Sequence, residues 1–312
     1  MTNPTPPSLP GLPAEAPSVL DATGNTPLVE LEGIWCKLEF LNPSGSVKAR
    51  LARYLIDRAE ISGRLQPGDT IVEATSGNTG NALAQVAAVK GYRMLVVLPE
   101  GISSERVAIS RAYGAEVVQI GDFHVNQALA YAEELGQRPG YFCPRQFASE
   151  GNVEENRNWL GPEILTQLPQ GRVPDALVMG VGTGGTLIGA GQAFRAVQPD
   201  CLTVAVEPAE SPTIATGRVG RHHLEGISDG FVPEIITRHR DEIDELVTVA
   251  SDDAIAEIKR IAAAHGCFVG PSSGAHLLAA KTLRRRRPEL ETVVTLLCDS
   301  GEKYLSEYFP AR

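Results

Sequence analysis

Residues 70–90 read TIVEATSGNTGNALAQVAAVK, and this stretch decides the fold. The β-branched and apolar segment Thr70–Ala74 predicts a short strand, and apolar residues recur every three or four positions over Asn78–Lys90, as in a helix. Small polar residues and glycines join the two. A strand that passes through such a turn into a helix is the repeating unit of a parallel sheet covered by helices.

The same alternation continues along the chain. Further strands are predicted at 94–98, 116–120, 176–181, 203–207 and 293–298. Helical periods lie between them, at 104–113, 126–135, 186–197 and 252–265. This order predicts an α/β fold with parallel sheets, right-handed crossovers and helices on both faces. Two strand–helix series, about 42–146 and about 174 to the end, predict two sheets with a cleft between them.

Composition excludes several classes of protein. The chain has 312 residues, and 28 Lys and Arg against 38 Asp and Glu give a net charge of −10. An acidic balance argues against a nucleic-acid partner, because phosphates require a basic face. No apolar run approaches the roughly 18 to 20 residues that span a membrane. The basic run 284–287 is interpreted as a solvated helix end.

Cysteine usage and the N-terminal segment indicate where the protein works. Five cysteines are scattered without C-x-x-C spacing, so reduced and mostly buried thiols are expected. Residues 1–17 are rich in proline and predict an irregular arm, which is neither a secretory signal nor a transit helix. A cytoplasmic protein is expected. The histidines have no metal-ligand spacing, and we predict no metal.

The turn after the first quoted strand is a candidate anion site. Backbone N–H groups, the hydroxyls of Thr75, Ser76 and Thr79, and the dipole of the following helix all favour a carboxylate or a phosphate there. A simple capped turn would need only one polar residue, such as Asn78. The succession of polar residues and glycines exceeds that requirement, so a ligand is the preferred interpretation.

A lysine stands at the head of another predicted helix. Residues 42–48 read NPSGSVK, and an apolar period follows Lys48. The positive end of a helix dipole disfavours an ammonium group, so the pKa of Lys48 is expected to be lowered toward a usable amine. Taken alone, Lys48 is better explained as a solvent-facing lysine.

A glycine-rich run, GVGTGGT at 180–186, follows a predicted strand and precedes a helix. A dinucleotide site fits poorly, because the spacing is not G-x-G-x-x-G and the run lies past the middle of the chain. A cup for one terminal phosphate fits better. Residues 270–275 and 299–302 are weaker turns of the same kind, and all such turns meet at the carboxyl edge of the sheets.

Together these turns bring an amine, a phosphate cup, a carboxylate cradle and a pair of hydroxyls to one cleft. A Schiff-base cofactor that carries a phosphate needs these groups. The ordered motifs NPSGSVK, TSGNTG, GTGGT, SSGA and DSGE resemble those of the pyridoxal-phosphate enzymes of fold type II, specifically the cysteine synthase and cystathionine β-synthase family. The resemblance runs from about residue 26 to about residue 309.

The resemblance implies the architecture. It implies two parallel-sheet αβα domains of the tryptophan synthase β type, with the active site in the cleft between them. The smaller, mobile domain would be 42–147, and the larger, which binds the cofactor phosphate, would be 18–41 plus 148–312.

The resemblance also implies residue roles. Lys48 would form the internal aldimine with pyridoxal 5'-phosphate, and Asn78 would hold the ring hydroxyl. Ser272 would face the pyridine nitrogen; a neutral hydroxyl does not keep that nitrogen protonated, which weakens the electron sink and favours β-elimination over transamination. The phosphate would be bound by Gly182, Thr183, Gly184, Gly185 and Thr186. The substrate carboxylate would be bound by Thr75, Ser76, Asn78, Thr79 and Gln146.

The implied reaction forms L-cysteine from O-acetyl-L-serine and sulfide through an aminoacrylate, with Lys48 moving the Cα proton and ping-pong kinetics. The alternatives are another β-replacement or β-elimination on a serine or cysteine derivative, including an O-phosphoserine sulfhydrylase or a cystathionine β-synthase, and a paralogue that binds a partner. The family further implies a homodimer and, as a partner, the tail of a serine acetyltransferase.

Three positions depart from the family pattern: Ala49 stands for Asp, Ser149 for Asn and Asn156 for His. They are expected to border the substrate and could change the leaving group or the nucleophile. The stretch 225–229, EGISD, is acidic where relatives that use O-phosphoserine carry arginine. Glu225 is therefore expected to repel a phosphate leaving group, although Arg218 and Arg221 lie close in sequence.

Overall fold

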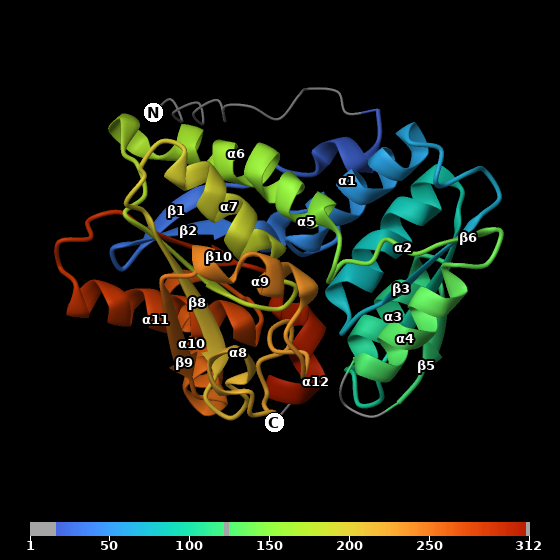
Figure 1. The fold of residues 1–312 in the computed structure, drawn as a ribbon. Helices are drawn as coiled ribbons and strands as arrows, with labels where there is room; N and C mark the ends of the chain where they lie inside the picture. The colour runs from blue at the N-terminus through green and yellow to red at the C-terminus, as the bar shows by residue number, and fades with distance from the viewer. Residues whose placement is uncertain (1–16, 122–124, 310–312) are drawn as a thin grey trace, which may run out of the picture.

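The computed structural model describes residues 17–121 and 125–309, and it contains two sheets (Figure 1). The larger has the order β1-β2-β10-β7-β8-β9 and the smaller the order β5-β4-β3-β6. The strands of the larger sheet are β1 (Leu28–Leu31), β2 (Ile34–Leu38), β10 (Val293–Leu297), β7 (Ala176–Gly180), β8 (Leu202–Pro208) and β9 (Glu245–Val249). Those of the smaller sheet are β5 (Glu116–Gln119), β4 (Arg93–Leu98), β3 (Thr70–Ala74) and β6 (Tyr141–Phe142).

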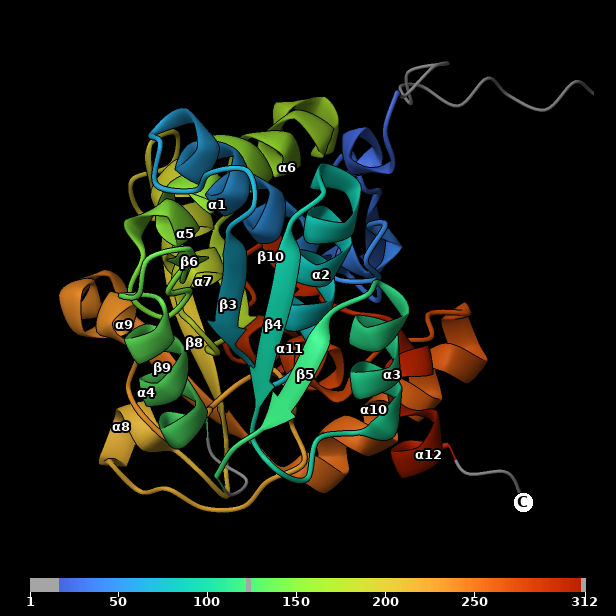
Figure 2. The same ribbon diagram turned by 90° about the vertical axis from the view of Figure 1, so that its right-hand side faces the viewer.

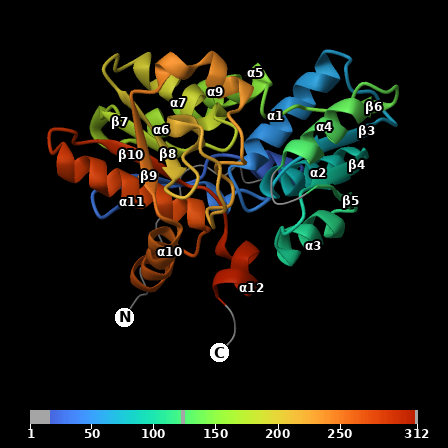
Figure 3. The same cartoon turned by 60° about the horizontal axis from the view of Figure 1, so that its bottom comes forward.

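Helices cover both sheets. Around the smaller sheet lie α1 (Lys48–Ile61), α2 (Asn78–Lys90), α3 (Ser104–Ala112) and α4 (Asn126–Leu135), as Figure 2 shows. The larger sheet has α6 (Gly161–Gln167) and α7 (Gly185–Arg195) on one face and α10 (Ser251–His265) and α11 (Pro271–Arg286) on the other (Figures 1 and 3). The shorter helices are α5 (Glu150–Glu155), α8 (Thr213–Thr216), α9 (Glu234–Arg238) and α12 (Leu305–Tyr308).

Alternation along the central strands explains this layering. In β7, Ala176 and Val178 pack in the core with α10 and α11, whereas Leu177 and Met179 pack in the core with α6 and α7. Successive side chains of a strand point to opposite faces, so a strand that is apolar throughout needs a helix layer on each face. The α/β fold with two parallel-sheet layers, expected from the sequence, is confirmed.

The N-terminal hairpin was not expected. Strands β1 and β2 pair antiparallel through a tight turn at Glu32 and Gly33, both with positive φ (53° and 81°), so this edge of the larger sheet is not parallel. Strands β6 and β9 were also missed. The β-like stretch 267–269 contains no strand; Val269 makes one isolated bridge with Ser300. The domain boundaries at 42 and 147 and the mobility of the smaller domain stay predictions.

Other sequence-based expectations are settled by the same structure. All five cysteines are free thiols, and four of them are buried. The arginine run does close a helix, α11. The proline-rich arm falls outside the described residues, apart from Pro17. Within the described parts of the chain, no helix is long and apolar enough to cross a membrane.

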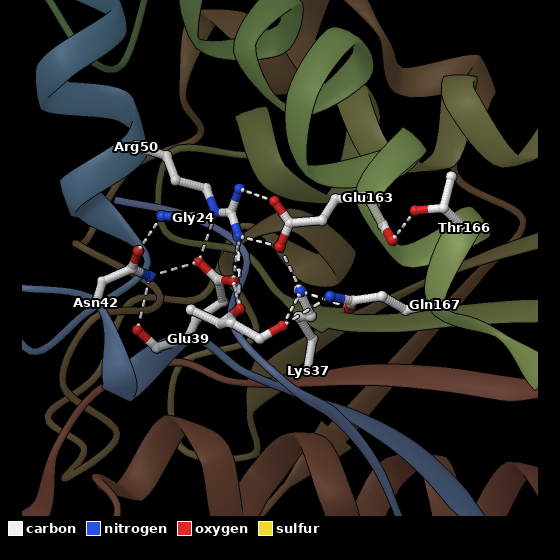
Figure 4. Close-up of polar contacts among 9 residues, drawn as sticks. Gly24, Lys37, Glu39, Asn42, Arg50, Glu163, Thr166 and Gln167 are labelled. Atoms are coloured by element: carbon white, nitrogen blue, oxygen red, sulfur yellow. Dashed lines mark hydrogen bonds and ion pairs between the residues drawn. The ribbon is translucent and has the colours of Figure 1, made fainter. Parts of the chain in front are cut away.

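A buried charge cluster fixes the start of α1 (Figure 4). The guanidinium of Arg50 donates to both carboxylate oxygens of Glu39, at 2.8 Å each, and to both of Glu163, at 2.7 and 2.8 Å. Lys37 bonds to Glu163 as well. Burial alone would raise the pKa of Glu163, but Arg50 and Lys37 lower it to about 2.

Asn42 extends the cluster toward the turn that precedes Lys48. Its side-chain amide donates to Glu39 at 2.8 Å, and its carbonyl oxygen accepts from the backbone N–H of Gly24 at 2.9 Å. The cluster therefore joins α1, the end of the β1–β2 hairpin and α6. It holds the start of α1, whose first turn contains no acidic side chain.

We expect Arg50→Met to lower the free energy of unfolding by about 3–5 kcal/mol, because Glu39 and Glu163 would remain as buried carboxylates without their main partner. Chemical denaturation at pH 7 measures this. Arg58→Met on the same helix is the matched control: Arg58 pairs with Glu154 at a half-exposed site, and its loss should cost less than about 1 kcal/mol. Equal losses in the two variants would contradict the assignment.

Candidate active site

One pocket lies between the two sheets. It encloses about 630 Å³, part of it open to solvent, and is lined from both sides. Of the predicted site residues, all but Gly185 line it: Lys48, Thr75, Ser76, Asn78, Thr79, Gln146, Gly182, Thr183, Gly184, Thr186 and Ser272. The motifs that are widely separated in sequence therefore meet in one place, at the carboxyl ends of the strands.

Lys48 is the first residue of α1 and projects into this pocket. The backbone N–H of Val47 donates to the carbonyl of Cys298 at 2.8 Å, which ties the lysine to the end of β10. Within the described chain, Nζ has no hydrogen-bond or ion-pair partner. The pKa of Lys48 is lowered as expected, but burial is the main cause and nearby acidic groups partly oppose it. The helix dipole is thus not the leading reason.

The glycine run forms an anion cup at the start of α7. Gly184 has a φ of 89°, which lets the backbone turn into the helix. A Cβ on Gly182 would lie 2.4 Å from the carbonyl oxygen of Gly226, so the loop can follow this path only with glycine there. Backbone N–H groups at the first turn of a helix of this length suit a phosphate.

Gly185 has a different task from its neighbours. A Cβ at this position would lie 2.1 Å from Oδ1 of Asn152, so the glycine makes room for that side chain. Asn152 is buried, and its amide donates to Thr183 Oγ1 and to the carbonyl of Gln146, at 2.9 Å each. Asn152 was not predicted as a site residue, and its contacts are too distant in sequence to be read from a motif.

The turn after β3 is held open in a similar way. Thr75 Oγ1 accepts from the backbone N–H of Gly77 at 2.9 Å, and Arg106 donates to the carbonyl of Ser76 at 2.9 Å. Gly77 has a φ of 139°, and a Cβ there would lie 2.4 Å from the Arg106 side chain. Arg106 therefore holds the turn on the side away from the pocket, and the side that lines the pocket is left for a ligand.

A hydrogen-bond chain connects the two anion-binding turns. Thr79 donates to the Gln146 side chain at 2.6 Å, and the Gln146 amide donates to the carbonyl of Ala74 at 2.8 Å. Through Asn152, the same residue is linked to Thr183 in the glycine run. The two turns are therefore joined by a continuous set of buried polar contacts.

Asn78 is oriented by the motif near the C-terminal end. Its amide donates to Asp299 at 2.7 Å, and its carbonyl oxygen accepts from Lys303 Nζ at 2.8 Å. Asp299 also accepts from the hydroxyl of Tyr304. The weak motif DSGE at 299–302 therefore serves to position Asn78.

Three chemically active residues also line the pocket: Asp229, His276 and Cys298. Asp229 belongs to the acidic stretch 225–229 expected near the leaving group, whereas His276 and Cys298 were not predicted. Asp229 is the only carboxylate among the lining residues. Burial raises the pKa of the Cys298 thiol well above its usual range, so it stays protonated. His276 could have been found from helix periodicity, because it follows Ser272 by one turn of α11.

Several expectations about the substrate side are wrong. Ala49, Ser149 and Asn156 do not line the pocket; Ala49 and Asn156 are buried in helix packing, and Ser149 precedes α5. Glu225 does not line it either, because its carboxylate accepts from the hydroxyl of Tyr308. Arg218 and Arg221 are exposed and lie outside the pocket, as expected for surface arginines. Within the described residues, no group of three or more His, Cys, Asp or Glu side chains could hold a metal ion.

Comparisons with known proteins identify the family. The family model of the pyridoxal-phosphate dependent enzymes matches residues 19–299. A cysteine synthase of Staphylococcus aureus is 41% identical over 298 residues, which are 93% of this chain and 95% of the relative. The O-ureido-L-serine synthase of Streptomyces lavendulae is 40% identical over 299 residues, 93% of this chain and 91% of that protein.

A solved structure gives the same result. The O-acetylserine dependent cystathionine β-synthase of Helicobacter pylori superimposes with a TM-score of 0.89 at 33% identity, covering 95% of this chain and 99% of that one. These relatives share the fold but carry names of different reactions. The chain belongs to the pyridoxal-phosphate dependent enzymes of fold type II, in the family of the cysteine synthases and cystathionine β-synthases.

Proposed function

We propose that this enzyme forms L-cysteine from O-acetyl-L-serine and sulfide. The observation that carries the proposal is the pocket itself. It sets the amine of Lys48, without a hydrogen-bond partner in the described chain, between an anion cup at the start of α7 and a second anion-binding turn at the start of α2. One cup suits the phosphate of the cofactor, and the other suits the carboxylate of an amino acid.

The residues present fit pyridoxal phosphate. Lys48 would hold the aldehyde carbon, the residues 182–186 the phosphate, Asn78 the ring hydroxyl and Ser272 the ring nitrogen. The glycines support this assignment, because a Cβ at Gly182 would collide with the Gly226 backbone and push the cup away. When bound, the cofactor withdraws electrons from the Cα of the amino acid.

The chain's own residues then bind the substrate and transfer its Cα proton. Thr75, Ser76, Asn78, Thr79 and Gln146 hold the substrate carboxylate. The lowered pKa of Lys48, caused by burial, makes its amine available as a base for the Cα proton, and the same amine later returns that proton. Acetate leaves between these steps and sulfide adds. Movement of the smaller domain, 42–147, would exclude water meanwhile.

Asp229 favours an acetyl over a phosphoryl leaving group. Its carboxylate lines the pocket, and a dianionic phosphate ester would be repelled there. This reason replaces the one based on Glu225. The relatives that make O-ureidoserine or cystathionine keep a second candidate open: another β-replacement with the same acyl-serine donor and a different nucleophile.

We place the enzyme in the cytoplasm, as a homodimer. A serine acetyltransferase tail would enter the same carboxylate cradle, because a C-terminal carboxylate resembles that of the substrate. A paralogue that only binds such a tail would not need the amine of Lys48, and this favours an enzyme.

Replacing the lysine tests the central assignment. We expect Lys48→Ala to lower the rate of cysteine formation by at least about 100-fold, because the base for the Cα proton is lost. Borohydride reduction followed by peptide mass spectrometry should locate the cofactor on Lys48 in the unmodified protein. Lys90→Ala, on the surface of α2, should keep both properties. Cofactor bound to a different lysine would refute the proposal.

Asn152 tests the hydrogen-bond chain. Asn152→Ala removes the support of Thr183, and we expect the half-saturating concentration of pyridoxal phosphate to rise about 5- to 10-fold, the effect of about one lost hydrogen bond. Absorbance titration of the cofactor-free protein measures this. Asn158→Ala, an exposed residue two turns away, is the control and should bind as the unmodified protein does.

Asp229 tests the choice of leaving group. Asp229→Asn should raise kcat/KM for O-phosphoserine relative to O-acetylserine by about 5- to 10-fold, since a nearby like charge is removed. Glu225→Gln, outside the pocket, should leave this ratio unchanged. Steady-state rates with both donors decide the matter; an unmodified enzyme that prefers O-phosphoserine would contradict the proposal.

A further inference from the structure

His276 is a pocket residue to which the proposed reaction gives no task. It lies on α11, is 0% exposed and lines the pocket. Its Nδ1 lies 3.0 Å from the carbonyl oxygen of Leu296. A carbonyl can only accept, so Nδ1 carries the hydrogen and Nε2 has a bare lone pair. This Nε2 is buried and has no hydrogen-bond partner among the described residues.

The surroundings keep the imidazole neutral. Burial lowers the pKa of His276 to about 4; the hydrogen bond to Leu296 opposes this, and the nearby charge of Lys48 adds to it. Cys298, whose Sγ lies 3.8 Å from Nδ1, is protonated and neutral. Gly180 faces the other nitrogen: a Cβ there would lie 2.5 Å from Nε2. A glycine therefore allows the lone pair to reach this part of the pocket.

Ser272 stands one helical turn before His276, on the same face of α11. Both residues line the pocket, and Ser272 is 4% exposed. A serine hydroxyl rotates freely and has one hydrogen to donate. In the proposed function, on which this inference rests, the oxygen of Ser272 faces the ring nitrogen of the cofactor.

Counting donors and acceptors gives an imbalance. An unprotonated ring nitrogen and His276 Nε2 are both acceptors. The Ser272 hydroxyl, one helical turn from His276, makes no hydrogen bond to Nε2 in this structure, and its single hydrogen can serve only one of the two acceptors. One buried acceptor would stay unpaired, which is unfavourable. One additional proton removes the conflict: the ring nitrogen donates to the Ser272 oxygen, and the Ser272 hydroxyl donates to Nε2.

We propose that His276 is a positioning residue that accepts the hydroxyl hydrogen of Ser272, so that Ser272 in turn accepts from a protonated ring nitrogen of the bound cofactor. The extra proton comes from solvent when the cofactor binds, and no other bond changes. The inference departs from the expectation for a lone serine, which leaves the ring nitrogen neutral. A protonated ring withdraws electrons from the substrate more strongly.

Nitrogen NMR of the protein loaded with cofactor labelled with ¹⁵N in the ring tests this directly. We expect the ring resonance of the unmodified protein at the position of a pyridinium reference. His276→Leu, which keeps a similar volume but has no acceptor, should shift it to the position of neutral pyridine. Ser272→Ala should do the same. His265→Ala, a histidine on α10 paired with Glu32 at the surface, should leave the resonance unchanged.

The outcomes separate this inference from the proposed function. A protein that never binds the cofactor on Lys48 refutes the function itself. A protein that binds it there, but shows a neutral ring nitrogen both with His276 and with leucine, refutes only this inference and indicates a buried water at Nε2. Should His276→Leu fold poorly, Ser272→Ala and the imidazole ¹⁵N shifts of the cofactor-free protein still decide: a proton on Nε2 would overturn the proposal.

Discussion

The contact of Arg50 with two buried carboxylates is the constraint on which the site depends. Its planar guanidinium faces Glu39 and Glu163 at once, so α1 can start in one position only. Because Lys48 is two residues before Arg50, the same contacts also fix where the reactive amine begins. A buried ion pair adds little net stability to a fold. Removing one of its partners is nevertheless strongly destabilising, because the other charge is then buried without a partner.

A second constraint ties the two anion-binding turns together. Thr79, Gln146, Asn152 and Thr183 form a continuous set of hydrogen bonds from the turn after β3 to the cup before α7. The predicted domain boundary at residue 147 falls inside this set.

Local patterns revealed most of the fold, and long-range contacts account for what was missed. Strand β3 and the helices α2 and α4 have the bounds read from the sequence, because their periodicity and turns are local signals. One of the two partners of Arg50, Glu163, is 113 residues away, and no sequence pattern indicates it. The same holds for Asn152, whose contact with Thr183 spans 31 residues. Asp229 belongs to the acidic stretch 225–229, but the residue singled out there was Glu225. Only His276 had a usable signal, the helical spacing from Ser272.

Strand order has a consequence for synthesis of the chain. Strand β10 lies between β2 and β7, so the N-terminal hairpin has no neighbour in the larger sheet until residues 293–297 have been synthesised. Asn78 likewise waits for Asp299, 221 residues later. Domains usually fold from the N-terminus as they leave the ribosome. Here the growing chain carries an unpaired hairpin edge until the residues of β10 have been made.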